Sequence, residues 1–194
     1  LGGRQILLQG GHNVNLRIDY FEDLFQRIKG RFDIHLHALS PPEIVHTAKI
    51  SRLTINETLQ RLSDAGLDSI PGGGAEILVD HVRRKISPHK CSTDEWLNVM
   101  GCAHGMGIPT TATMMFGHVE TVEDRIEHLY RIRKQQDKTA GFTAFIPWPF
   151  QPGRTELSID FGITSQVTGL DYLRTLAISR IFLDNFVNLQ SSWV

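Results

Sequence analysis

The stretch DSIPGGGAEILVD, residues 68–80, joins a short apolar run to a second one through three consecutive glycines. Glycine loses more backbone entropy on folding than any other residue, so three together need a physical reason. One glycine is enough for a tight turn, whereas a ligand that lies against bare backbone favours several. The stretch predicts a strand that ends at a glycine-rich turn and a helix over 75–86. Glu76 is expected in the first helical turn, either as a ligand for ribose hydroxyls or as a partner of the helix dipole.

The same order of apolar run, polar turn and amphipathic helix recurs along the whole chain. Strands are predicted within 4–11, 33–40, 67–74, 109–118, 142–152 and 187–194. Helices are predicted within 19–32, 40–50, 54–66, 75–86, 92–107, 121–141 and 169–185. Prolines 147, 149 and 152 argue against a regular strand throughout 142–152, because proline donates no ladder hydrogen bond. Three S/T-x-x-E patterns, at Ser40–Glu43, Thr54–Glu57 and Ser92–Glu95, predict helix starts.

Six strands that alternate with helices predict an α/β fold with a parallel sheet and right-handed crossovers. An open sheet concentrates its polar strand ends at one switch point, whereas a barrel spreads them around its mouth. Here they follow nearly every strand, which favours a (β/α) barrel of the TIM type. Because eight units need roughly 250 residues, we expect one incomplete barrel domain over 1–194, lacking about one unit at each end.

Composition limits the possible partners. The 194 residues are 41% hydrophobic and carry a formal net charge of −1, which predicts no attraction to nucleic acid or membrane surfaces. No long apolar run or signal-peptide pattern is present, so a cytoplasmic protein is expected. The basic run 83–85 is expected on a solvated helix face. Cys91 and Cys102 match no zinc or redox spacing and predict neither a metal site nor a disulfide.

Polar residues at the strand ends are the candidate site. Gln9, Gly10 and Gly11 could hold an amino or carboxylate group, or form a simple turn. His35 and His37 share one strand face, which suits a metal pair of the amidohydrolase kind or, as we favour, hydrogen bonding to substrate. The other candidates are Thr111 and Thr113 as hydroxyls on one face, Trp148 and Phe150 as an aromatic wall, and His118 and Glu120 as proton carriers.

Six stretches, LLQGG, HLHALSPPEI, SIPGGGAEIL, TTATMMFGHVE, FIPWPFQPG and NLQSSWV, occur in this order along nearly the whole chain. Together they resemble the radical S-adenosylmethionine (SAM) enzymes of the futalosine menaquinone route and their deazaflavin-synthase relatives. The resemblance is greatest to the branch that cyclises dehypoxanthine futalosine. Aminofutalosine synthases and deazaflavin synthase subunits are the alternatives within the family. A metal-dependent hydrolase, or a barrel piece that only binds SAM or a partner chain, remains as an alternative outside it.

The resemblance implies residue roles. Residues implied in SAM binding are Gln9, Gly10, Gly11, Glu43, Pro71, Gly72, Gly73, Gly74 and Glu76. Residues implied at the substrate are His35, His37, Thr111, Thr113, Trp148, Phe150 and Gln190, with His118 or Glu120 as proton acceptor.

The family holds a four-iron four-sulfur (4Fe-4S) cluster, reduced by an external electron donor, through a CxxxCxxC loop after its first strand. The motif does not occur in this sequence. We therefore expect the cluster ligands upstream of Leu1 and a chain that is inactive by itself.

Overall fold

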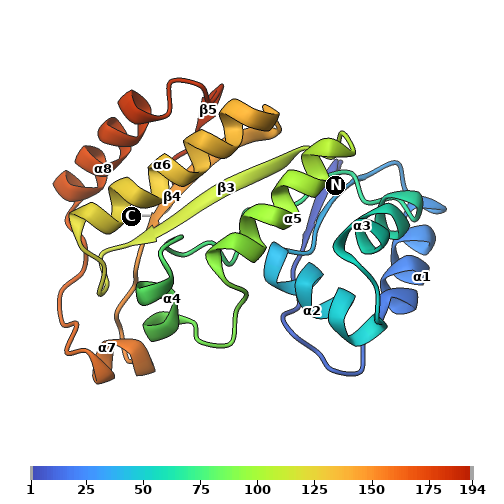
Figure 1. The fold of residues 1–194 in the computed structure, drawn as a ribbon, viewed down its shortest axis with the longest axis horizontal. Coiled ribbons are helices and arrows are strands. Elements are labelled where there is room, and N and C mark those ends of the chain that lie inside the picture. Colours follow the sequence, from blue (N-terminus) through green and yellow to red (C-terminus); the bar gives the residue numbers. More distant parts are fainter. Residues whose placement is uncertain (1, 193–194) are drawn as a thin grey trace.

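The computed structural model describes residues 2–192 as a series of short parallel strands flanked by helices (Figure 1). The strands are β1 (Gln5–Leu8), β2 (His35–Ala38), β3 (Thr110–Phe116), β4 (Phe142–Pro149) and β5 (Asn188–Leu189). The helices are α1 (Ile18–Lys29), α2 (Pro41–Ser51), α3 (Ile55–Asp64), α4 (Asp80–Ile86), α5 (Thr93–Gly105), α6 (Val122–Thr139), α7 (Glu156–Asp160) and α8 (Gly169–Phe182). In Figure 1, α8 and α6 lie at one end of this series and α1 and α3 at the other.

The strands pair in sequence order, all parallel. One sheet holds β1 and β2, and the second holds β3, β4 and β5. Two isolated parallel bridges, His37 with Ser69 and Ile70 with Thr110, connect the sheets. The predicted strand within 67–74 is therefore reduced to two bridging residues, and the order of all six predicted segments is that of a partial barrel.

The helix predicted over 75–86 is shorter than the sequence suggested, because α4 begins at Asp80. Gly74 and Glu76 have φ values of +73° and +46°, in the left-handed region that a right-handed helix excludes. The expectation that Glu76 occupies a first helical turn is therefore wrong. It lies in the loop before α4, so it has no helix dipole to complement.

Strand β4 includes Pro147 and ends at Pro149, so the strand does not extend throughout 142–152, as the prolines predicted. The N–H of Phe150 donates to Phe116 O on β3, so the odd-numbered residues 147 and 149 turn their nitrogens toward the β5 side. Pairing with β5 ends at Phe145, and no ladder donor is needed beyond it. Of the strand predicted over 187–194, β5 keeps two residues, and 193–194 lie outside the described residues.

The three helix starts that the S/T-x-x-E patterns predicted are confirmed. Ser40–Glu43, Thr54–Glu57 and Ser92–Glu95 all form capping boxes, and Pro41 begins α2. These reciprocal bonds satisfy backbone donors that the first helical turn leaves unpaired. The box at Ser40 starts α2 two residues after the end of β2.

Side chains alternate along the strands between a face that packs against the helices and a face that is open. On β2, Leu36 and Ala38 are fully buried, whereas His35 and His37 are half-buried. Buried residues of α5, among them Trp96, Val99, Met100 and Ala103, belong to the core on the packed side. Trp96 stacks on Phe142 and Phe142 on Phe186, with ring centroids 6.2 and 5.4 Å apart. The opposite strand face is left for the cavity described below.

Replacing Phe142 with alanine is expected to lower the free energy of unfolding by about 3–5 kcal/mol, because it leaves a cavity among well-packed rings. Chemical denaturation measures this loss. The matched control is Phe32→Ala, at a ring that is 60% exposed, which should change stability by less than about 0.5 kcal/mol. Equal losses in both variants would contradict the packing described here.

Acid is expected to destabilise the fold partly through His104. Its ring nitrogens contact the hydroxyls of Thr139 and Thr110 at 2.6 and 2.8 Å, and burial lowers its pKa from 6.5 to about 4. Between pH 6.5 and 4, His104 is protonated in the unfolded chain but stays neutral in the folded chain. The free energy of unfolding therefore falls as the pH decreases toward 4. Denaturation series from pH 7.5 to 4 should show a flatter dependence for His104→Gln and an unchanged one for His89→Gln, an exposed histidine. Identical slopes in wild type and His104→Gln would refute this origin.

Candidate functional site

A cavity of about 930 Å³ lies on the open strand face, bordered by residues from every predicted strand. Its lining includes Gln5, Leu7, Gln9, His35, His37, Ser69, Pro71, Gly72, Gly73, Thr111, Thr113, Ile146, Trp148, Asn188 and Gln190. Ten of these lining residues were predicted as site residues from the sequence: Gln9, His35, His37, Pro71, Gly72, Gly73, Thr111, Thr113, Trp148 and Gln190. The volume is in the range of small-molecule sites.

The triple-glycine turn is fixed by side chains that bind its carbonyl groups. Gly72 O accepts from Thr113 Oγ1 at 2.7 Å, Gly73 O from Trp96 Nε1 at 3.2 Å and Gly74 O from Arg83 Nη1 at 3.1 Å. Gly72 N–H also donates to Thr111 Oγ1 at 2.9 Å. The two threonine hydroxyls that were predicted to meet a ligand therefore hold the turn against β3.

Close approach explains why the turn is made of glycine. A Cβ atom on Gly72 would lie 2.6 Å from the backbone oxygen of Thr111, and one on Gly73 would lie 2.4 Å from Gln9 Nε2. The first contact is with rigid backbone and the second with a flexible side chain. The turn thus packs directly on β3 and brings the end of β1 beside it.

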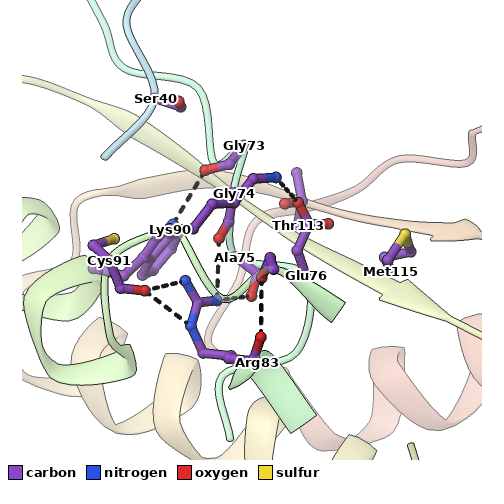
Figure 2. A network of polar contacts seen from close by, with 12 residues as sticks. Ser40, Gly73, Gly74, Ala75, Glu76, Arg83, Lys90, Cys91, Thr113 and Met115 are labelled. Atoms are coloured by element: carbon purple, nitrogen blue, oxygen red, sulfur yellow. Dashed lines mark hydrogen bonds and ion pairs between the residues drawn. The ribbon is translucent and has the colours of Figure 1, made fainter. Parts of the chain in front are cut away.

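The prediction that Arg83 lies on a solvated helix face is wrong. It is 3% exposed rather than solvated, and its guanidinium donates to the carbonyls of Gly74, Ala75 and Cys91. Figure 2 shows it joining the glycine turn to the loop after α4. Burial lowers its pKa, which the nearby Glu76 and Asp80 oppose. Helix α4 has only seven residues, too few for a hydrophobic periodicity that would show in the sequence that Arg83 is buried.

Glu76 belongs to the same network and does not line the cavity. Its Oε1 pairs with Lys90 Nζ at 2.6 Å, and its Oε2 is buried with no partner among residues 2–192 (Figure 2). Its main-chain oxygen accepts from Met115 N on β3. In this structure Glu76 secures the turn, and Gly74 also lies behind the cavity lining.

Glu43 fastens the first glycine pair to α2. One carboxylate oxygen accepts from Gly10 N at 2.7 Å and from Gly11 N at 2.9 Å. The other accepts from the N–H and the hydroxyl of Ser40. The predicted ligand groups Gly10, Gly11 and Glu43 therefore bind one another, and Gln9 alone of this turn lines the cavity.

His35 and His37 contact the same hydroxyl. His35 Nε2 lies 2.7 Å and His37 Nδ1 2.6 Å from Ser69 Oγ, and all three residues line the cavity. Burial, followed by the neighbouring His35, lowers the pKa of His37. The pair shares a serine rather than a third metal-binding side chain. Ser69 was not singled out in the sequence, although it occupies the strand position next to the glycine turn.

The predicted proton carriers lie apart from this cavity. His118 donates from Nε2 to Met115 O and accepts at Nδ1 from Val119 N, so both ring nitrogens are occupied. The Glu120 carboxylate accepts from Gly117 N, His118 N and Arg125 Nε. Burial lowers the pKa of His118. Its ring borders a separate hollow between α6 and α8. His118 and Glu120 are therefore better suited to fixing the turn after β3 than to accepting a proton from a substrate.

Phe150 also departs from the predicted arrangement. It is 7% exposed, and its ring meets His118 edge-on at 6.1 Å instead of lining the cavity. Strand alternation directs Ile146 and Trp148 into the cavity, and the N–H of Phe150 pairs with β3 beyond them. Of the predicted aromatic wall, Trp148 is the part that borders the cavity.

The cysteines do not provide a cluster site. Cys91 and Cys102 are free, and burial raises the pKa of the Cys91 thiol to about 11, which disfavours the thiolate that metals require. Among residues 2–192, no group of three or more His, Cys, Asp or Glu side chains could hold a metal ion. The described residues therefore do not fit an iron–sulfur cluster.

The comparisons with known proteins identify the family. A model described as the radical SAM superfamily matches residues 1–132, and one described as the CofH/MqnC C-terminal region matches 139–194. The chain belongs to the radical SAM superfamily. This family implies SAM and a 4Fe-4S cluster as cofactors.

Three similar relatives carry different names. Cyclic dehypoxanthine futalosine synthase of Halalkalibacterium halodurans is 47% identical over the whole chain and 52% of its own length. Aminodeoxyfutalosine synthase of Thermus thermophilus is 45% identical over 99% of the chain and 52% of its own. The 5-amino-6-(D-ribitylamino)uracil–L-tyrosine 4-hydroxyphenyl transferase 1 of Methanosarcina barkeri is 44% identical over 98% and 52%. The chain thus spans about half the length of these curated enzymes.

A solved structure supports the fold. Methylornithine synthase (PylB) superposes with a TM-score of 0.69 at 16% identity, covering 95% of this chain and 49% of that one. The predicted partial TIM-type barrel is therefore confirmed. Within residues 2–192 no helix is both long and apolar enough to cross a membrane.

Glu43→Gln is expected to loosen the first glycine turn, because an amide nitrogen replaces an acceptor that faces several N–H and O–H donors. Amide hydrogen exchange at Gly10 and Gly11 should accelerate, and the free energy of unfolding should fall by about 1–3 kcal/mol. Glu57→Gln is the matched control, since Glu57 forms the same capping box at α3 without a glycine turn. Unchanged exchange at both glycines in Glu43→Gln would contradict the assigned role.

Proposed function

We propose that this chain is part of a radical SAM cyclase that converts dehypoxanthine futalosine to its cyclic form, within a single partial barrel domain over 1–194. The observation that carries the proposal is the cavity in which the tips of successive parallel strands converge beside two glycine-rich turns. Its volume of about 930 Å³ has room for a nucleoside-like molecule beside a flat one. A cyclic dehypoxanthine futalosine synthase that is 47% identical over the whole chain supports this reaction within the family.

The two glycine-rich turns are where SAM would lie. Gly72 and Gly73 border the cavity with bare backbone, and Gln9 beside them carries an amide that can both donate and accept. Glu43, Gly74 and Glu76 would act behind these residues by fixing the turns. When bound, SAM supplies a deoxyadenosyl radical that abstracts a hydrogen atom from the substrate.

The substrate would lie against the side chains of the open strand face. Trp148 offers a flat apolar surface for an aromatic ring, and His37 and Gln190 offer polar groups beside it. Apolar Leu7 and Ile146 help exclude water from a reactive carbon radical. The cluster and the external electron donor would act through residues other than those described.

The sibling reactions are the second candidate, because relatives with other names are 45% and 44% identical. They differ from cyclisation in the mass of their product. An intramolecular cyclisation that loses one hydrogen atom, one proton and one electron yields a product two hydrogens lighter than its substrate. No other molecule is incorporated.

The test is anaerobic reconstitution of the full gene product with iron and sulfide, followed by incubation with SAM, a reductant and dehypoxanthine futalosine. We expect deoxyadenosine together with a product two hydrogens lighter, measured by mass spectrometry. Protein left without iron and sulfide is the control and should form neither. Two results would replace this proposal by a sibling reaction. One is that deoxyadenosine and product form only with 5-amino-6-(D-ribitylamino)uracil and tyrosine, and the other is that an adduct forms instead of a cyclised product.

A further inference from the structure

We propose that His37, Ser69 and His35 form a proton relay in which His37 accepts a proton from substrate in the cavity and Ser69 passes charge on to His35. This inference rests on the proposed cyclisation. Ser69 Oγ lies 2.6 Å from His37 Nδ1 and 2.7 Å from His35 Nε2, short distances for two hydrogen bonds to one hydroxyl. All three side chains belong to the cavity lining.

The backbone holds the serine in this position. Ser69 is 7% exposed and forms a parallel bridge with His37, its N–H donating to Leu36 O and its carbonyl accepting from Ala38 N. Alternation on β2 directs both histidines to the same side as the serine, because they are two residues apart. The hydroxyl is therefore fixed between two rings by strand pairing rather than by a mobile loop.

One hydroxyl has one proton, so it donates to one ring and accepts from the other. In the arrangement assigned here, His37 Nδ1–H donates to Ser69 Oγ and the Ser69 hydroxyl donates to His35 Nε2. His37 Nε2 is then the unprotonated nitrogen of the ring and can accept from a molecule in the cavity, which His37 lines. Neutral imidazole is the form that can act as a base.

An ion pair between Lys29 and Asp68 lies beside the His35 end of the trio. Asp68, which accepts from Lys29 Nζ and Leu36 N, lies close enough to His35 to interact with its charge. Burial opposes ionisation of Asp68, yet the bonds from Lys29 and Leu36 and the neighbouring His35 together keep its pKa below the usual value. At His37, burial and then His35 act in the opposite direction and lower the pKa of the ring. Through the relay, a proton taken up at His37 would reach the His35 end of the trio, beside the Asp68 carboxylate.

The relay acts after ring closure. After the carbon radical has bonded to the aromatic ring, the attacked ring carbon still holds a hydrogen. That C–H bond breaks, its proton bonds to His37 Nε2, and its electron pair stays in the ring. The Nδ1 proton of His37 passes to Ser69 Oγ as the Ser69 proton passes to His35 Nε2. The remaining unpaired electron leaves to a one-electron acceptor outside the described residues, and the ring regains aromaticity.

The first test measures histidine tautomers by nitrogen-15 NMR in the full gene product, with signals assigned through His37→Gln and His35→Gln. We expect His37 to be protonated on Nδ1 in wild type and to lose this preference in Ser69→Ala, while Ser69→Thr, which keeps a hydroxyl, retains it. Ser63→Ala on α3 is the matched control and should change nothing. A His37 tautomer that is protonated on Nε2, or that Ser69→Ala leaves unaltered, would overturn the relay.

The second test separates hydrogen abstraction from proton removal. In Ser69→Ala, deoxyadenosine should still form while cyclised product falls about 100-fold, a typical contribution of acid–base catalysis. A serine with only a structural role would lower both in proportion, and that result would also overturn the relay. Absence of cyclised product from the wild-type enzyme, with the NMR result as expected, would instead refute the proposed function and leave the hydrogen-bonded trio in place.

Discussion

The contact between Gly72 and strand β3 is the constraint on which the site depends. Thr111 accepts from the Gly72 N–H and Thr113 donates to its carbonyl, so both backbone groups of one glycine are held by a single strand. A side chain at Gly72 would meet the backbone of Thr111 at 2.6 Å, which no rotamer change relieves. The strand segment before the turn is reduced to the two bridging residues 69–70. Because few backbone hydrogen bonds join this segment to β3, the bonds from Thr111 and Thr113 hold the turn against that strand. The positions of the glycine turn, of Ser69 before it and of the cavity wall that they form all depend on this contact.

Polar atoms around the cavity therefore fall into two groups. Those of Glu43, Arg83 and the two threonines are engaged by backbone groups and fix the turns in place. Buried polar groups must find partners, and these partners are supplied by the protein. Gln9, Gln190 and His37 belong to the second group, which lines the cavity. Chemistry on a substrate is expected from this second group, because its polar atoms are less completely committed to the scaffold.

Much of this arrangement could be predicted from the sequence, for reasons that are physical. Capping boxes and alternation are local patterns, so the helix starts and the residues that share a strand face were foreseen. Arg83 and Ser69 were missed because their roles depend on contacts between segments far apart in the sequence. His118 and Glu120 were misplaced because a strand exit can turn either into the barrel mouth or behind it. The left-handed φ of Glu76 excludes this residue from α4, and its residue type gives no sign of that conformation.

Relatives of 44–47% identity have three different enzyme names, so overall similarity does not select a reaction. A residue whose polar atoms are all bound by the protein, such as Glu43, stabilises the same turn whichever substrate is present. Discrimination must come from side chains that face the cavity without forming its frame. Ile146 and Trp148 on β4, and Gln190 directly after β5, line the cavity beyond strand β3. Under the proposed function, the glycine turns on one side of the cavity would serve the cofactor, and the residues of the last strands would distinguish one flat substrate from another.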